Sequence, residues 1–287
     1  MRTATARVPG IDRVLHFEVH EHDDRHVSER IATEGTWEPF ETELILRFLR
    51  EPPAGVPEAE RHLFVDCGAN LGWYSVVAAT LGAQVVAFEP LPANAALLRS
   101  NVARNTLNDR VEIHELALGS EAPRGVLRLS ADNQGDHRLI PDGIRAEPTS
   151  RRELIVEMGT LDSVLAGRRP TVIKIDTQGS EVAILRGGRS SWSEGNPVIV
   201  LEFWPYGLER CGASAAELLI LLGEMVDVTH SCFEIMEWRQ ALERVTMADL
   251  ARMATLGGYS PAMKGFTNLV LVPRGKTGVV ADLLVVR

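Results

Sequence analysis

The segment at residues 63–90 constrains the fold of this chain more than any other stretch. An apolar run ends on Asp66 and leads into a turn with the spacing Asp-x-Gly-x-Asn-x-Gly. A helical segment at 73–81 follows, and a second apolar run then ends on Glu89. This order of strand, glycine turn, helix, strand and acid predicts two parallel strands joined by a helix.

The geometry of such a unit predicts a nucleoside-binding site. The carboxyl ends of its two strands lie at one edge of the sheet, where open α/β folds bind their ligands. Gly68 and Gly72 let the backbone approach a ligand closely, and the following helix offers unpaired N–H groups. Glu89, 17 residues after Gly72, is positioned to accept hydrogen bonds from a ribose diol.

The kind of nucleoside is indicated by the residues that the turn lacks. A dinucleotide-binding turn has the pattern G-x-G-x-x-G, whose second glycine makes room for a pyrophosphate. This chain has Asn70 at that position and Trp73 at the position of the third glycine. The spacing instead resembles motif I of class I S-adenosylmethionine-dependent methyltransferases, whose cofactor carries no phosphate.

A wider set of motifs resembles one family of these enzymes. The matching segments are DCGANLGWYS, AFEPLPAN, NVARN, ALGS, DNQGDHRL, TLDSVL, IKIDTQGSEVAILRG and LEFWP. Their order and spacing, over about residues 35–272, are similar to those of the FkbM family of methyltransferases. The resemblance implies a Rossmann-like α/β fold of class I with a mostly parallel seven-stranded sheet, helices on both faces and an N-terminal extension.

Three parts of the chain are expected on this basis. Residues 1–50 form the N-terminal extension and a cap helix, which the segment WEPFETELILRFLRE predicts by its helical spacing of apolar residues. A loop with three prolines then leads into the methyltransferase domain at 51–275. Residues 276–287 remain as a C-terminal tail.

The cofactor that the resemblance implies is S-adenosyl-L-methionine, with S-adenosyl-L-homocysteine as the product. In the class I fold the region around Ala117 passes beneath the adenine, and Asp176 ends a further apolar strand at the same sheet edge. The predicted cofactor-binding residues are Asp66, Gly68, Asn70, Gly72, Glu89, Pro90, Ala117 and Asp176.

The acceptor side of the site is predicted from polar residues near that edge. The side chains able to act as a base are His137, Asp176, Glu181, Glu202 and His230. We favour His137 because an imidazole titrates near neutral pH, and Asp176 is the second choice. Gln178 stands at the position where the family has a glutamate. If that glutamate holds a proton or a metal in relatives, it is open whether this chain has the same function there. The predicted substrate-binding residues are Trp37, Asn133, Glu181, Glu202 and Trp204.

Composition and charge disfavour several classes of partner. The net charge is −9 and no lysine or arginine cluster stands out, which disfavours nucleic acid and acidic membranes. Three cysteines far apart, without C-x-x-C spacing, suit a reducing compartment, and the N-terminus lacks an apolar signal, so we expect a cytoplasmic protein without a structural metal. Residues 67–88 lack formal charge, but glycines and polar residues interrupt them, which indicates a buried helix and strand rather than a membrane span.

Two features leave alternatives open. His16, His20, His22 and His26 lie close together in an alternating segment, where a solvated or edge-strand position is favoured over a metal site. The strongly apolar helix at 214–225 suits either the core or a homo-oligomer interface.

The leading functional hypothesis is transfer of a methyl group from S-adenosylmethionine to a hydroxyl of a small natural product or sugar. Oxygen as the acceptor atom is implied by the family resemblance, since the residues themselves do not distinguish oxygen from nitrogen or carbon. The alternatives are a metal-assisted O-methyltransferase that uses Asp176 and nearby carboxylates, a nicotinamide-dependent oxidoreductase, and a non-catalytic binding module.

Overall fold

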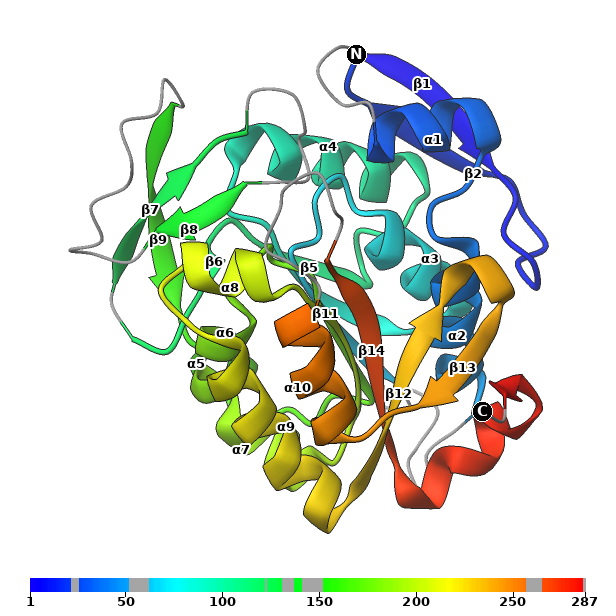
Figure 1. Cartoon of the computed structure of the whole chain (residues 1–287). Helices are drawn as coiled ribbons and strands as arrows, with labels where there is room; N and C mark the ends of the chain where they lie inside the picture. The colour runs from blue at the N-terminus through cyan, green and yellow to red at the C-terminus, as the bar shows by residue number, and fades with distance from the viewer. Residues whose placement is uncertain are drawn as a thin grey trace.

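A nine-stranded sheet forms the centre of the molecule (Figure 1). The computed structural model describes residues 1–21, 26–51, 62–121, 123–130, 137–140, 152–256 and 265–285. In spatial order the strands are β15 (Leu284–Val285), β13 (Ala241–Arg244), β12 (His230–Met236), β14 (Thr267–Pro273), β11 (Val198–Phe203), β10 (Val172–Ile175), β3 (Leu63–Cys67), β4 (Gln84–Phe88) and β5 (Val111–His114). The five strands from β11 to β5 are parallel, and β14 runs antiparallel between β11 and β12. The predicted α/β class is confirmed, and β13 and β15 extend the sheet beyond the seven strands expected.

Alternate residues of the central strands pack into two separate cores, one on each face of the sheet. Phe64 and Val172 pack on one face, whereas Val65 and Ile173 pack on the other. The helices on the first face are α2 (Pro39–Arg50), α3 (Trp73–Leu81) and α4 (Pro92–Arg104). The second face is covered by α5 (Leu161–Leu165), α6 (Glu181–Gly187), α7 (Arg189–Gly195), α8 (Pro205–Arg210), α9 (Ala215–Val228) and α10 (Met247–Leu256). Burial on both faces explains why these strands are nearly continuous apolar runs.

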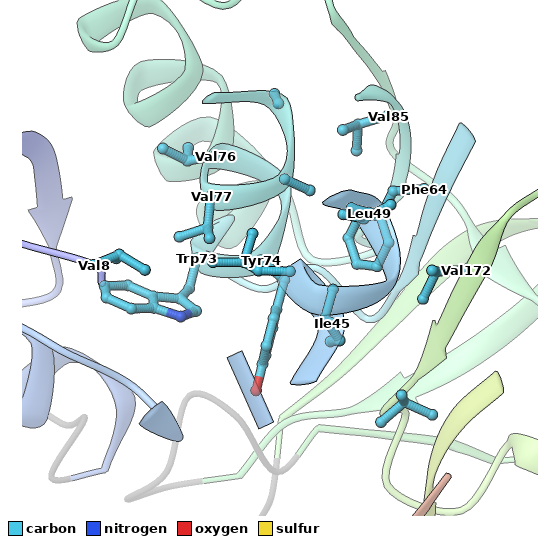
Figure 2. Packing of buried hydrophobic residues seen from close by; sticks show 14 of the residues in the cluster. Val8, Ile45, Leu49, Phe64, Trp73, Tyr74, Val76, Val77, Val85 and Val172 are labelled. Atoms are coloured by element: carbon cyan, nitrogen blue, oxygen red, sulfur yellow. The ribbon is translucent and has the colours of Figure 1, made fainter. Parts of the chain in front are cut away.

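The first core contains the helix that follows the glycine turn. Figure 2 shows Val76 and Val77 on one side of α3, and Tyr74 beside Ile45 of α2 with its hydroxyl pointing away from α3. The indole of Trp73 stacks on Phe17 with ring centroids 5.1 Å apart. The helix α2 is thus part of the main core as well as a continuation of the N-terminal extension.

A second, smaller sheet covers one end of the central sheet. Its strands are, in order, β6 (Ala117–Leu118), β9 (Glu153–Gly159), β7 (Arg124–Arg128) and β8 (Arg138–Ile140). Leu127 and Val156 form a small apolar cluster there with Leu91 and Ala117. This cluster joins the small sheet to the segments that follow β4 and β5.

The described part of the C-terminal segment, up to residue 285, packs against the main domain. The 3-10 helix η3 (Arg274–Leu283) buries Val280 in the first core, and Asp282 forms an ion pair with Arg47 of α2 at 2.8 Å. The strand β15 then pairs with β13. Another 3-10 helix, η2 (Glu237–Arg239), joins β12 to β13.

The N-terminal extension is a small unit held to the main domain by two asparagines. It contains β1 (Arg2–Ala6) paired antiparallel with β2 (Leu15–Val19), followed by α1 (Val27–Glu34). Asn101 Oδ1 accepts a hydrogen bond from Glu18 N at 2.6 Å, and its Nδ2 donates to Glu18 O at 3.0 Å. One helical turn later, Asn105 makes the same pair of bonds with the backbone of His16, at 3.0 and 2.7 Å.

The two side-chain amides therefore take the place of a neighbouring strand along β2. Asn101 Nδ2 also donates to Leu71 O at 2.8 Å, so one amide connects the extension to the glycine turn. Both asparagines belong to the NVARN motif, which the sequence alone associated only with the end of a helix. Because residues four apart share one face of a helix, this spacing matches alternate residues of a strand.

Replacing Asn101 with alanine is expected to lower the free energy of unfolding by about 2–4 kcal/mol. The change removes three hydrogen bonds and leaves buried backbone groups without partners. Urea denaturation measures the difference, with Asn108→Ala as the control because Asn108 is exposed just beyond the same helix. Equal stability of the two variants would contradict this role of Asn101.

Candidate active site

A cavity of about 360 Å³ lies at the carboxyl ends of β3, β4, β10 and β11. The N-terminal extension contributes His26, Val27, Trp37 and Glu38 to its wall, and the small sheet contributes Leu127. Ligand pockets in proteins usually measure roughly 300–1,000 Å³. The sheet edge predicted from the sequence therefore forms the floor of a concave pocket of the size that ligands use.

The glycine turn after β3 needs Gly68 for two reasons. Its φ of +88° lies in the left-handed region, and a Cβ at this residue would be 2.0 Å from the carbonyl oxygen of Asp176. The N–H groups of Gly68 and Ala69 both donate to Phe88 O, at 3.0 and 2.9 Å. The turn thus bridges the ends of β4 and β10, and no side chain fits between them.

Glu89 lies at the base of the cavity and receives two backbone hydrogen bonds. Its Oε2 accepts from Asn70 N at 2.8 Å and its Oε1 from Leu91 N at 2.9 Å. Burial raises the pKa of Glu89 to about 7, although the N–H donors of Leu91 and Asn70 oppose the shift. The Asn94 side chain also hydrogen-bonds to Glu89. Because a carboxylate offers about four lone-pair sites, acceptor capacity remains for a ligand hydroxyl group.

Asn70 supplies a second polar contact at the same end of the cavity. It has a φ of +52°, and its side-chain Oδ1 is buried. Among the residues that the structure describes, this oxygen has no hydrogen-bond partner. A buried acceptor of this kind favours a ligand that brings an N–H or O–H donor.

Asp66 and Gly72 lie beneath the turn rather than at the cavity wall. The Asp66 carboxylate is 1% exposed and accepts a hydrogen bond from Ser75 Oγ at 2.6 Å, which ties β3 to α3. Burial raises the pKa of Asp66 to about 6. Gly72 begins α3 with a φ of +90°, where a Cβ would lie 2.3 Å from Leu98 Cδ1. Asp66 and Gly72, both predicted to bind the cofactor, thus shape the glycine turn from below.

An apolar slot extends from Glu89 towards the small sheet. Pro90 and Ala117 line it as predicted. Phe88 also lines it, and its ring stacks on His114 with centroids 5.3 Å apart. Further lining side chains are Leu116, Leu118, Leu127 and Leu139. A slot of this composition suits a flat heteroaromatic ring.

A continuous polar chain runs along the opposite side of the cavity. Hydrogen bonds and ion pairs of 2.7–3.1 Å connect its members, which are Glu38, Tyr74, Glu41, Lys174, Asp176, Gln178 and Glu202. Lys174 Nζ lies 3.1 Å from Glu41 Oε1 and 3.0 Å from Asp176 Oδ2, and it sits 4.5 Å from the centre of the Tyr74 ring. The polar chain thus has four carboxyl groups and one ammonium.

Burial and charge set different protonation preferences along the polar chain. Burial acts to lower the pKa of Lys174, but Asp176, Glu41 and Glu38 together raise it well above the usual value. Burial acts to raise the pKa of Asp176, but the Lys174 ammonium and the Gln178 amide hold it below the usual value. Burial, followed by the charges of Asp176 and Glu181, raises the pKa of Glu202 well above normal.

The hydroxyl of Tyr74 identifies the carboxyl that carries a proton at rest. It lies 2.7 Å from Glu38 Oε2 and 3.1 Å from Glu41 Oε1, yet a phenol has a single proton to donate. Glu41 Oε1 also lies 3.1 Å from Lys174 Nζ, and its Oε2 accepts a hydrogen bond from Asn268 Nδ2 at 2.7 Å, so both of its oxygens have other donors. The proton in the hydrogen bond between Tyr74 and Glu38 therefore belongs to the Glu38 carboxyl. This agrees with the pKa of Glu38, which burial and the charge of Glu41 raise to about 8.

The structure limits what the two predicted catalytic residues can do. Each Asp176 oxygen accepts a hydrogen bond, Oδ2 from Lys174 Nζ at 3.0 Å and Oδ1 from Gln178 Nε2 at 2.9 Å, and these donors hold the pKa of Asp176 below its usual value. His137 lines the cavity, but its Nδ1 accepts a hydrogen bond from Ser130 N at 3.0 Å. A neutral imidazole that accepts at Nδ1 carries its proton on Nε2, so it can donate to a ligand but not take up a proton there.

The predicted substrate-binding residues divide into three groups. Trp37, Glu202 and Trp204 line the cavity, and the Arg138 guanidinium lies 4.7 Å from the Trp204 ring centre. Glu181 does not line it, because its buried carboxylate accepts from the N–H groups of Thr177 and Gly179, each at 3.2 Å, and fixes the turn after β10. Asn133 lies outside the described residues.

The other histidines singled out in the sequence differ in their surroundings. His230, considered as a base, is buried and its Nε2 lies 2.8 Å from Pro197 O. In the extension, His20 Nε2 contacts Asn94 Oδ1 at 2.8 Å, His26 lines the cavity, and His22 lies outside the described residues. In the described ranges no group of three or more His, Cys, Asp or Glu side chains is arranged to hold a metal ion. Nor does any helix of those ranges have the length and apolarity to cross a membrane.

Sequence reasoning missed the centre of the polar chain. Lys174 is the single charged residue in the buried strand β10, and such an interruption of an apolar strand is a signal for a buried ion pair. Glu41 and Tyr74 gave no comparable signal, since each occupies an ordinary position on an amphipathic or apolar helix. Only the packing of α2 and α3 against β10 brings them to Lys174.

Several solved methyltransferases are similar in structure to this chain, at low identity. Methyltransferase FkbM from Methylobacillus flagellatus KT is 19% identical, with 73% of this chain and 43% of that chain covered and a TM-score of 0.43. Precorrin-6Y C5,15-methyltransferase from Geobacter metallireducens GS-15 is 14% identical, with 89% of this chain and 92% of that chain covered and a TM-score of 0.41. The O-methyltransferase TomG from Streptomyces achromogenes is 12% identical, with 84% of this chain and 78% of that chain covered and a TM-score of 0.35.

The family assignment comes from the sequence match. No curated protein matches this chain significantly. The family model described as the methyltransferase FkbM domain matches residues 66–244, which is more than half of the chain and includes the glycine turn, Glu89 and most of the polar chain. This chain belongs to the FkbM family of methyltransferases.

Proposed function

We propose that this protein transfers a methyl group from S-adenosylmethionine to a hydroxyl of a small natural product or sugar. S-adenosylmethionine supplies a methyl group bonded to a positively charged sulfur, and methyl transfer is the chemistry of the family. Transfer of this kind depends mainly on alignment and exclusion of water, which can contribute roughly 7–11 kcal/mol. The cavity enclosed by the extension and the small sheet supports such a mechanism.

The observation that carries the proposal is the pair Glu89 and Asn70. Both oxygens of Glu89 are oriented by backbone N–H groups, so the carboxylate is fixed as an acceptor for a ribose diol. The buried Oδ1 of Asn70 calls for a donor from a ligand, and both the ribose and the amino-acid end of S-adenosylmethionine have donors. The apolar slot beside them suits adenine. The residues present therefore fit this cofactor.

The charge of the cavity supports a cationic methyl donor and an uncharged acceptor. The polar chain contains more carboxyl groups than cations, so a sulfonium beside it gains electrostatic stabilisation. An acceptor that carries a carboxylate or phosphate would instead meet repulsion. A sugar or neutral aglycone hydroxyl meets none, and hydroxyl groups can bond to Gln178, Glu202 or His137 along the wall.

The affinity for S-adenosylhomocysteine is expected to rise with pH between 6 and 7 and then level off. Hydroxyl donors stabilise the ionised form of Glu89, so binding lowers its pKa from about 7 and releases a proton in that range. The affinity should change by up to about tenfold per pH unit, and Glu89→Gln should weaken it roughly 10–100-fold and remove this dependence.

Isothermal titration calorimetry at several pH values measures both effects. The control variant is Glu121→Gln, since Glu121 is exposed and does not line the cavity. Titration with NADH in parallel tests the nicotinamide alternative. Wild-type affinity in Glu89→Gln would contradict the assignment of Glu89, and tight NADH binding would contradict the cofactor itself.

Treatment with EDTA is expected to leave binding and methyl transfer unchanged. Lys174 already provides a positive charge between Glu41 and Asp176, where a divalent cation would otherwise neutralise the carboxylates. The measurement compares calorimetry and tritium transfer before and after EDTA dialysis. If dialysis abolishes methyl transfer and added Mg²⁺ restores it, the metal-assisted alternative is favoured instead.

A further inference from the structure

The backbone of Glu38 has a conformation that its sequence disfavours. Its φ of 39° and ψ of 66° lie in the left-handed region, which costs a residue with a side chain about 1 kcal/mol or more. The following residue is Pro39, and a proline further restricts the residue before it to extended conformations. A glycine at this position would avoid most of the cost, so the glutamate side chain must serve a purpose there.

Helix capping does not supply that purpose. Glu38 precedes α2, yet its side chain makes no capping hydrogen bond. The free N–H groups at the start of α2 donate to Glu237 instead, Phe40 N to Oε1 at 2.8 Å and Glu41 N to Oε2 at 3.0 Å. The Glu38 carboxyl is therefore available for another role.

The carboxyl of Glu38 is held at one oxygen and open at the other. Its Oε2 contacts the Tyr74 hydroxyl at 2.7 Å, which fixes the group against α3. Within the described part of the chain, Oε1 takes part in no hydrogen bond. Glu38 lines the cavity, on the same side as Asp176 and Glu202.

We propose that Glu38 is the catalytic base that removes the proton from the acceptor hydroxyl. The inference rests on the proposed function, since it needs a hydroxyl acceptor and a methyl donor in the cavity. The Glu38 carboxylate takes the hydroxyl proton at Oε1 while the acceptor oxygen bonds to the methyl carbon. The carbon–sulfur bond breaks with its electron pair left on sulfur, and the products are a methyl ether, a neutral thioether and a proton that passes from Glu38 to solvent.

The other cavity acids and the histidine are less suited to this step. Asp176 has both oxygens bonded and a pKa below normal, which makes it a weak base. His137 accepts at Nδ1 from Ser130 and presents a protonated Nε2. Glu202 Oε2 already accepts a hydrogen bond from Gln178 Nε2 at 3.1 Å, and burial raises the pKa of Glu202 well above normal. A base with a pKa near the working pH is the most effective, and it accelerates such a step by roughly 10²–10⁴-fold.

The pH dependence follows from the groups that face Glu38. Burial and the charges of Glu41 and Asp176 raise its pKa to about 8, whereas Lys174 and the Tyr74 hydroxyl act to lower it. Glu38 is thus largely protonated at pH 7 and becomes competent as a base as the pH rises through 8. The value of kcat/KM should increase about tenfold per pH unit below 8 and level off above it.

The experiment compares wild type, Glu38→Gln, Glu38→Asp and the control Glu43→Gln, an acid on the exposed side of α2 that pairs with Arg50. Calorimetry with S-adenosylhomocysteine tests the cofactor site, and tritiated S-adenosylmethionine with a panel of monosaccharides, inositol and simple phenols tests transfer. Infrared spectra of the wild type minus Glu38→Gln give a readout independent of turnover. A protonated-carboxyl band should disappear with a midpoint near pH 8, and Tyr74→Phe should shift this midpoint upwards.

We expect Glu38→Gln to bind S-adenosylhomocysteine with unchanged affinity but to transfer the methyl group at least about 100-fold more slowly. The increase of kcat/KM with pH should be absent in this variant. Glu38→Asp should regain part of the transfer rate. Transfer by Glu38→Gln within tenfold of wild type, or an alkaline rise that persists in it, overturns the proposal. So does wild-type protein that binds S-adenosylhomocysteine but methylates no hydroxyl in the panel. Wild-type protein that does not bind S-adenosylhomocysteine overturns the proposed function first, and the role of Glu38 with it.

Discussion

The structure depends on one buried cation, the ammonium group of Lys174. Removing an ion of this kind from water costs several kcal/mol, and only close partners offset the cost. Glu41 from α2, Asp176 beyond β10 and the ring of Tyr74 from α3 surround it, and Asn268 of β14 holds Glu41. Elements far apart in the chain are thereby fixed at one point. The precision of the acceptor side of the cavity comes from this arrangement, since loss of any partner would leave a buried charge uncompensated.

The N-terminal extension completes the site that the methyltransferase domain begins. The domain provides the glycine turn and Glu89, whereas Trp37 and Glu38 come from the extension and the start of α2. Asn101 and Asn105 bind β2 through paired amide hydrogen bonds, and Asn101 also holds the glycine turn at Leu71. The position of the extension and the shape of the turn are therefore set by the same side chain. Asn101 of α4 thus links the extension to the glycine turn at the cavity.

Local parts of the fold and site were predictable from the sequence, and long-range parts were not. The unit from β3 to β4 is contiguous, so its spacing alone predicted the turn, Glu89 and the sheet edge. Asp66 and Glu181 have the residue type of ligand contacts, but each is taken up by nearby donors, which only the folded backbone reveals. The preference for His137 used the usual titration of imidazole, whereas the Ser130 N–H decides which nitrogen carries the proton. The polar chain joins four separate segments of the sequence, so the hydrophobic periodicity of any one segment cannot predict it.

The close approach at Gly68 has a consequence for how this protein can vary. The turn after β3 and the turn after β10 touch through their backbones, with no room for even a methyl group between them. An insertion or deletion in either turn would need a matching change in the other, so both are constrained to evolve as a pair. The extension and the small sheet line the cavity with residues such as Trp37, Glu38 and Leu127. Divergence in acceptor preference is therefore most easily accommodated in those two regions.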